Sequence, residues 1–278
     1  DIPAGLLPAG DSGVEEAEPI VANPTLPVIE PEAGQLGALL AEHAALGGAL
    51  EADGAWAMGE AEFRGLVIAT GSASLDISAS RMNEQDRREL ERWLRNSVMP
   101  KWTLDSKELA HILSGAGFDI RGLDVDLSLA EFLCRPGQRP ADVAGLAMRH
   151  LHEEFPKLDK KPTAQALHED LLGRARAEYR LTPILVKDMD AHETRAIHDD
   201  LELPLARVLT QMEESGIAVD ASELDRLDSM HAERQSEVAA RAFAEIGGEE
   251  INLGSPKQLQ TVLFDRLGMP PTRKTKTG

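Results

Sequence analysis

The sequence predicts an α/β fold followed by an all-α segment, and three observations support this prediction. Residues 46–53, 62–70 and 74–78 have the composition of short strands separated by glycine-containing turns. Between residues 83 and 134, helical periodicity alternates with short extended runs, as in a mixed sheet with flanking helices. From residue 139 onward the pattern is almost wholly helical.

The α/β region is expected to begin with a short helix over residues 34–43, ahead of the three strands. Asn83 is a suitable cap for a helix that ends near Asn96, with Leu90, Trp93 and Leu94 on one face. The remaining elements expected here are a strand at 98–103, a helix at 105–116, an extended piece at 118–120 and a helix at 126–134.

The helical region is expected to contain helices at 142–155, 163–176, 201–215, 220–246 and 255–268. In the third of these, Leu201, Leu205 and Leu209 recur at helical spacing and Gly216 provides a C-terminal stop. Asp220 followed by Glu223, and Ser255 followed by Gln258, are each typical of a capping box at a helix start.

The amino-acid composition indicates a globular protein and argues against membrane-spanning and disulfide-rich proteins. Apolar residues make up 42% of the 278 residues, which is enough for a buried core. No apolar run approaches the roughly 20 residues of a membrane helix. The single cysteine, Cys134, excludes an internal disulfide framework and fits a reducing, cytoplasmic compartment. Because the chain begins with Asp1 and lacks a basic leader, we expect a piece of a longer protein without a signal peptide.

The charge is distributed unevenly. A net charge of −19 argues against nucleic-acid binding by the chain as a whole, because phosphates repel an acidic surface. Residues 251–278, however, contain five cations and one acid, so this segment carries +4 and the preceding residues carry −23. A basic end on an acidic body is typical either of a local nucleic-acid contact or of a solvated tail.

Ordered motifs near the C-terminal end carry a family resemblance. Residues 203–209 (LPLARVL), 212–213 (ME) and 216–220 (GIAVD) resemble the entrance to the polymerase domain of family A DNA polymerases. The motifs at 251–259 (INLGSPKQL), 263–264 (LF) and 267–270 (LGMP) are similar to later parts of the same domain, and residues 273–278 to its basic thumb loop. We therefore identify the sequence as similar to bacterial family A polymerases, of the DNA polymerase I type.

The resemblance implies DNA binding by this segment, because a family A thumb grips the duplex behind the growing primer end. The residues expected to contact DNA are Asn252, Ser255, Lys257, Gln258, Arg273, Lys274, Thr275, Lys276 and Thr277. Contacts of this kind hold the phosphate backbone without reading sequence. Ser255 before Pro256 is also typical of an ordinary capped helix, whose free N–H groups suit phosphate.

The earlier region resembles the 3′–5′ exonuclease domain of the same polymerases, a ribonuclease H-like fold with catalytic acids of the DEDD type. Residues 135–139 (RPGQR) resemble an actinobacterial form of this domain. Residues 1–28 are rich in Pro, Gly, Ala, Asp and Glu without periodicity, so we expect a disordered linker there. The resemblance implies an exonuclease-like domain over 29–196 and the first part of the polymerase thumb over 197–278, with a 5′-nuclease domain preceding Asp1.

The acids of this domain are degenerate. Proofreading nucleases hold two divalent metals with four carboxylates from three motifs. The first motif falls at Glu51 and Asp53 with the two acids interchanged, and the aspartate of the second falls near Lys107. Glu51 and Asp53 are therefore relic acids at most, or simply a pair that flanks a turn.

The remaining motif is also missing. Tyr179 is followed by Pro183 where the third motif requires an aspartate, and Asp188 and Asp190 are out of register. Asp126 matches an acid of the following helix that is not a metal ligand. The histidines show no zinc spacing. We expect no catalytic residue and no metal site, so that the domain is an inactive scaffold.

The favoured function is therefore a part of a DNA polymerase that acts in replication and repair. The intact enzyme would use Mg²⁺ and deoxynucleotides, whereas this chain needs no cofactor and binds primer–template DNA. It is expected to be a monomer, away from membranes, in the nucleoid region of the cytoplasm. Two alternatives stay open: an active 3′–5′ exonuclease of the same fold, and a non-enzymatic helical interaction module.

Overall fold

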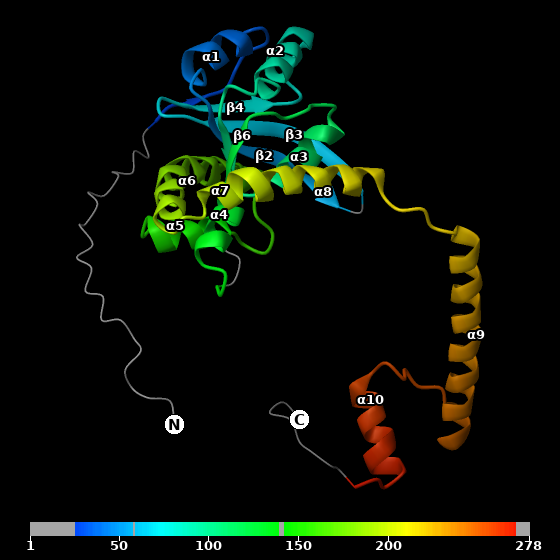
Figure 1. The fold of residues 1–278 in the computed structure, drawn as a ribbon. Coiled ribbons are helices and arrows are strands. Elements are labelled where there is room, and N and C mark those ends of the chain that lie inside the picture. Colours follow the sequence, from blue (N-terminus) through cyan, green and yellow to red (C-terminus); the bar gives the residue numbers. More distant parts are fainter. Residues whose placement is uncertain (1–25, 58, 139–141, 271–278) are drawn as a thin grey trace, which may run out of the picture. The chain divides into compact units, whose positions relative to one another are not determined.

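The computed structural model describes residues 26–57, 59–138 and 142–270. Contacts divide the chain into two compact units, Asp1–Gly216 and Ile217–Gly278. The first contains a mixed sheet with flanking helices and the described part of the second is helical (Figure 1). The predicted order of an α/β region followed by an all-α segment is confirmed. No helix in the described ranges has the length and apolar character needed to span a bilayer.

The sheet of the first unit has six strands among the described residues, in the order β1-β4-β3-β2-β5-β6. Strands β2, β3 and β4 form an antiparallel meander, whereas β1, β5 and β6 each join a neighbour in parallel. Their bounds are β1 Val28–Ile29, β2 Gly48–Ala57, β3 Glu60–Ala69, β4 Ser74–Ser78, β5 Lys101–Thr103 and β6 Leu123–Asp126.

Helices cover both faces of this sheet. The helices of the first unit are α1 Leu36–His43, α2 Glu84–Leu94, α3 Ser106–Gly115, α4 Leu127–Cys134, α5 Val143–His150, α6 Ala164–Ala191, α7 Arg195–Ile197 and α8 Leu203–Ser215, with a π-helical turn at His198–Glu202. The helices α1, α2 and α3 share one hydrophobic core with β2, β3 and β4. On the opposite face α6 packs against β2 and β3, beside α4 and α5 (Figure 1).

Strand alternation produces these two cores. Leu50 of β2 and Leu66 of β3 are buried in the core under α1–α3, whereas Ala49 and Val67 face α6. Successive side chains of a strand point to opposite faces of a sheet. The strand β2 therefore places its odd-numbered residues beside α6, and this includes Glu51.

The predicted start of α2 is confirmed in detail. The Asn83 side chain accepts hydrogen bonds from the backbone N–H groups of Gln85 and Asp86, and the Asp86 side chain accepts from the N–H of Asn83. Asp86 also accepts from the N–H of Gly34 at 2.7 Å and of Leu36 at 3.1 Å. One buried carboxylate therefore joins the starts of α1 and α2.

Several predicted bounds are wrong. The extended piece expected at 118–120 is a loop, and the strand lies at 123–126. The helix expected at 142–155 ends at His150, before the left-handed backbone of His152 (φ 56°). The helix expected to stop at 176 continues to Ala191.

The linker predicted over residues 1–28 lies largely outside the described residues. Its last three residues belong to the first unit. Val28 pairs with β4, the Pro27 carbonyl accepts from the Ser74 N–H at 2.9 Å, and the Leu26 carbonyl accepts from Arg176 at 2.8 Å. The predicted linker is therefore too long at this end.

The second unit contains α9 Ala221–Glu245, α10 Pro256–Gln260 and a π-helical turn at Thr261–Arg266. Asp220 caps α9 as predicted. The reciprocal hydrogen bond of the predicted capping box is missing, because the Glu223 carboxylate binds Arg226 at 2.7 Å instead. No residue of α9 is buried.

Candidate functional site

An acidic cavity lies where β2, the start of α3 and the helix α6 meet, and its volume is about 100 Å³. The charged side chains that line it are Glu51 of β2, Asp105 and Glu108 at the start of α3, and Arg174 of α6. The Asp105 carboxylate caps α3 by accepting from the N–H groups of Lys107 at 3.0 Å and Glu108 at 2.9 Å. The cavity therefore gathers one predicted relic acid with two acids of the second-motif region.

Glu51 pairs with an arginine. Its Oε1 lies 2.5 Å from Nη2 of Arg174, and its side chain is only 13% exposed. Burial raises the pKa of Glu51, while contacts with Glu178 and Arg174 oppose that rise. The guanidinium is the only cation among the charged groups that line the described cavity.

A second carboxylate, Glu178, lies one helical turn after Arg174 and has no exposed surface. Neither of its oxygens makes a hydrogen bond of normal geometry to a described residue. Burial, followed by the negative charge of Glu51, raises the pKa of Glu178 well above the ordinary range of a glutamate. Burial and the neighbouring Glu51 carboxylate therefore both favour the protonated form of Glu178.

Asp53, the other predicted relic acid, is also bound by an arginine. Its Oδ1 accepts from Nε of Arg64 on β3 at 2.9 Å, and Nη2 of the same guanidinium lies 2.8 Å away. Arg64 also binds Glu62 at 2.7 Å. Both side chains of the Asp53–Arg64 pair are more than two-fifths exposed, so the two relic acids sit in separate ion pairs.

Lys107, at the position of the second motif, binds a helix that lies far away in the sequence. Its Nζ is 2.5 Å from Oε1 of Glu213 on α8. The other oxygen of Glu213 is 2.6 Å from Nε2 of His111, whose ring stacks on Trp56 with centroids 4.0 Å apart. Lys107 and His111 together lower the pKa of Glu213. This cluster fixes α8 to α3.

The other acids considered from sequence have local roles. Asp126 is buried and joins two helix starts: it accepts from the N–H of Ser106 at 2.7 Å and caps α4 through the N–H of Leu129 at 3.0 Å. Asp188 binds Arg135 at 2.5 Å. Neither these acids nor Asp190 line the cavity around Glu51.

Tyr179, the remaining residue of the third motif, packs on Trp102 with ring centroids 5.6 Å apart. It is an aromatic packing residue on the α6 face of the sheet, beside Ala49, Val67 and Ala69. Its α6 neighbours Arg174 and Glu178, which sequence reasoning missed, are the residues that reach Glu51. The signal that could have revealed them is their spacing of four residues, which places them on one helical face.

These residues do not fit a pair of divalent metals. Within residues 26–57, 59–138 and 142–270, no three His, Cys, Asp or Glu side chains are grouped so that they could hold a metal ion. The Arg174 guanidinium is paired with Glu51, and the Glu178 side chain has no exposed surface. Two metals need several ionised carboxylates that converge on one point, and this arrangement does not provide them.

In the second unit, the described residues among the predicted DNA contacts are Asn252 and Ser255 in the turn before α10, and Lys257 and Gln258 at the start of α10. Ser255 caps α10 through the N–H of Gln258, and Oε1 of Gln258 accepts from the N–H of Asn252 at 2.7 Å. The predicted capping box is therefore incomplete, because Gln258 holds Asn252 rather than the cap residue. Lys257 is exposed. The predicted contacts Arg273, Lys274, Thr275, Lys276 and Thr277 lie outside the described residues.

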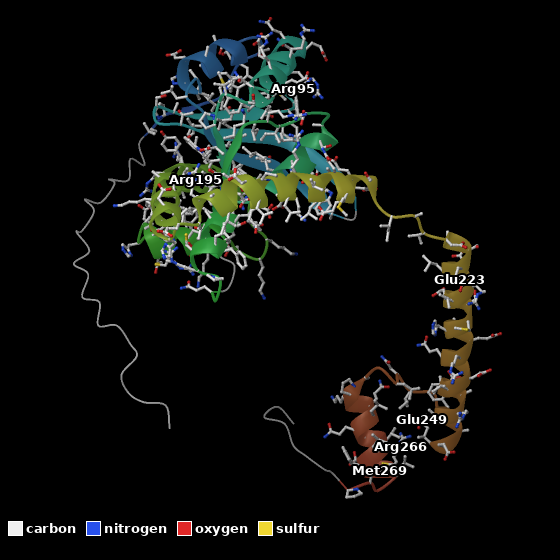
Figure 2. The ribbon with its side chains drawn as sticks, viewed as in Figure 1. Arg95, Arg195, Glu223, Glu249, Arg266 and Met269 are labelled. Carbon is white, nitrogen blue, oxygen red and sulfur yellow. The ribbon has the colours of Figure 1, made fainter. Side chains whose placement is uncertain are left out.

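An ion pair connects two segments of this unit. Arg266 binds Glu249, which joins the end of the π-helical turn to the segment after α9 (Figure 2). The contact uses one of the cations of the basic segment. The other described cation of this segment, Lys257, is exposed and forms no ion pair with a described residue.

Comparison with known proteins shows what this chain is similar to. Residues 58–159 match the family described as DNA polymerase I, ribonuclease H-like domain. DNA polymerase I of Mycobacterium tuberculosis strain H37Rv is 36% identical over 79% of this chain and 25% of its own length. DNA polymerase I of Geobacillus stearothermophilus is 36% identical over 67% of this chain and 22% of its own length. The chain thus spans about a quarter of the length of these relatives.

Among solved structures, the POL domain of Pol1 from M. smegmatis, in complex with DNA primer-template and dNTP, superposes with a TM-score of 0.68. The sequences are 35% identical, and the match covers 90% of this chain and 43% of that one. An identity above one third over nine-tenths of the chain extends the likeness beyond the residues matched by the family description. The chain therefore belongs to the DNA polymerase I family, and its first unit contains the ribonuclease H-like domain of that family.

Proposed function

We propose that this chain is part of a DNA-directed DNA polymerase that acts in replication and repair. In this proposal the ribonuclease H-like domain is an inactive scaffold and the second unit contributes to the thumb, which grips primer–template DNA. The likeness to a polymerase structure that contains DNA primer-template and dNTP carries the proposal. The whole enzyme would use Mg²⁺ and deoxynucleotides, as a monomer at the nucleoid.

The pairing of the relic acids supports the loss of nuclease activity. Glu51 is bound by Arg174 and Asp53 by Arg64. Two-metal hydrolysis requires carboxylates that are free to hold cations on both sides of a scissile phosphate. Each pairing instead places an arginine where a metal would have to approach the acid.

The nuclease part is tested by incubating the 278-residue chain with a 5′-labelled single-stranded oligonucleotide in Mg²⁺ or Mn²⁺. We expect no metal-dependent shortening from the 3′ end, in the wild-type chain or in Glu51→Ala. Shortening by the wild-type chain that Glu51→Ala abolishes would show that the domain is an active exonuclease.

The basic end of the second unit supports the DNA contact. Lys257 is exposed beside the turn at residues 252–255, and the sequence continues into Arg273, Lys274 and Lys276. Cations and backbone N–H groups near a helix start are suited to phosphate oxygens. Since residues before 251 are strongly acidic, we expect binding to depend on this one region.

The DNA part is tested by fluorescence anisotropy with a labelled primer–template at a series of salt concentrations. Each phosphate contact contributes about 0.9 to the slope of log K against log salt. The triple variant Arg273→Ala/Lys274→Ala/Lys276→Ala should therefore lower the slope by about 2.7, and Lys257→Ala by about 0.9.

A matched control removes three exposed cations from α2 and the residue that follows it, through Arg88→Ala/Arg92→Ala/Arg95→Ala (Figure 2 labels Arg95). It changes the net charge equally, so its slope should stay at the wild-type value if the contact is local. An equal loss of slope in the control would reject a local grip. Salt-independent binding by the wild-type chain would favour the helical interaction module.

A further inference from the structure

The buried acids on the α6 face of the sheet require a cation or a proton. Glu51 and Glu178 approach each other from β2 and α6, and the Glu178 side chain has no exposed surface. An ionised carboxylate removed from water is costly unless a positive group or hydrogen bonds compensate it. Neither oxygen of Glu178 has a hydrogen-bond donor of normal geometry among the described residues.

We propose that the Arg174 guanidinium is the built-in counter-ion of the Glu51–Glu178 pair, and that it makes this acid site independent of divalent metal. The inference deepens the proposed loss of nuclease activity and rests on it. Arg174 lies 2.5 Å from Glu51 and four residues before Glu178 on α6. The same helical face thus supplies both the second acid and the cation.

The surrounding charges explain why one cation is decisive. The charged groups that face Glu51 are Asp105 and Glu108 from α3, and Asp170, Arg174 and Glu178 from α6. All but Arg174 are acids. Arg174 also lies 3.4 Å from Asp170, one turn earlier on α6. Removal of the guanidinium would leave a buried carboxylate surrounded by like charges, which disfavour its ionised form.

The packing of α6 fixes the position of this arginine. Leu171, Leu172 and Ala175 pack against Ala49, Val67 and Ala69 of the sheet. These contacts set the rotation of the helix about its axis, so that Arg174 is held at the rim of the cavity with its side chain 39% exposed. A guanidinium is permanently charged near neutral pH and presents a planar fork of donors to carboxylates.

The proposal is tested by a double-mutant cycle of thermal unfolding with Arg174→Met and Glu51→Gln in the 278-residue chain at pH 7.5. Breaking a partly buried ion pair should lower Tm by about 5 °C or more in Arg174→Met. In the Glu51→Gln background, the same change should lower Tm by less than half as much, because the charge that needs compensation is gone.

The control cycle uses Arg64→Met and Asp53→Asn, an exposed pair between β3 and β2, the strand that also carries Glu51. Its coupling should be at most about 1 °C, as for exposed ion pairs in general. Equal losses of Tm for Arg174→Met in both backgrounds would overturn the proposal. If Arg174→Met fails to fold, soluble folded protein obtained from Glu51→Gln/Arg174→Met supports it, and an unfolded double variant rejects it.

Metal independence has its own readout. The wild-type Tm in 5 mM EDTA should equal that in 5 mM MnCl₂ to within about 1 °C, because the Arg174 guanidinium already pairs with the Glu51 carboxylate. A rise of several degrees with Mn²⁺, lost in Glu51→Gln, would show that a metal displaces Arg174 and would overturn the inference. Nuclease activity is measured separately, so failure of the proposed function and failure of this inference are distinguishable.

Discussion

Lys101 is a lysine without exposed surface, at the first position of β5. Its ammonium donates to the carbonyl oxygens of Asn96 at 2.8 Å and Met99 at 3.0 Å, and it lies 4.7 Å from the ring centroid of Trp93. Burial lowers the pKa of Lys101 to about 8. No acidic side chain among the described residues forms an ion pair with it, so the hydrogen bonds to carbonyls and the aromatic face compensate its charge only in part.

This lowered pKa predicts a dependence of stability on pH. The unfolded chain keeps the Lys101 proton up to a pH near 10.4, whereas the folded chain releases it near pH 8. Between these values the unfolded state binds more protons, so the free energy of unfolding should rise with pH, by about 3 kcal/mol in all. Denaturant unfolding of the wild-type chain and Lys101→Met from pH 7 to 10.5 measures the effect by difference. Parallel curves would contradict the lowered pKa.

Single residues of the candidate site could be predicted only where a local motif carried them. The strand pattern and the family resemblance identify Glu51 and Asp53 as candidate residues. In the structure, each carboxylate forms an ion pair with an arginine. Arg174 lies more than 120 positions further along the sequence. No local pattern pairs it with Glu51, because that contact depends on where α6 crosses the sheet.

The helix α6 is the element in which sequence and structure differ most. The sequence predicts that it stops near Arg176, whereas the helix of the structure includes Pro183, a residue without the N–H that continues a helix. It continues to Ala191 because Leu181, Leu185 and Met189 extend its buried face, while Pro183 lies on the exposed side. Burial of these side chains against α4 and α5 outweighs the lost hydrogen bond.

We therefore expect Pro183→Ala to stabilise the first unit. A proline in a helix interior costs about 3 kcal/mol relative to alanine, and about 1 kcal/mol is offset because proline restricts the unfolded chain. The variant should raise Tm by roughly 4 °C, measured by circular dichroism at 222 nm. Pro162→Ala, just before the Thr163 cap, is the control and should give no gain. A lower Tm for Pro183→Ala would mean that the proline fits a conformation that alanine does not keep.

The strand β6 lies a few residues after the extended piece that the sequence predicts at 118–120. Phe118 and Ile120 read as an extended pair, and both are buried in the core under α1–α3, but as a loop. The chain turns at Gly122, which has φ 70°, and only then pairs with β5. An apolar run marks burial more reliably than it marks strand pairing, because pairing depends on the neighbouring strand.

At the scale of the molecule, the two units differ in how their helices are stabilised. The hydrophobic clusters of the described residues all lie in the first unit. In α8, which ends that unit, Thr210 is buried, whereas Val208 and Met212 are more than 45% exposed. The fold class and the order of the two regions could be predicted from sequence because they depend on periodicity. The use of a polar face of α8 for docking could not, because it depends on Lys107 and His111 meeting Glu213.

This distribution of the core predicts independent stability of the first unit. A chain that ends at Gly216 keeps every described hydrophobic cluster and the Lys107–Glu213 contact. Its Tm should lie within about 2 °C of that of the full chain. Residues 217–278 alone should show helical circular dichroism without a cooperative transition, because Val262 is the one buried side chain among the described residues of that unit. Calorimetry of both pieces provides the measurement. A loss of more than about 5 °C in the shorter chain would show that the second unit stabilises the first.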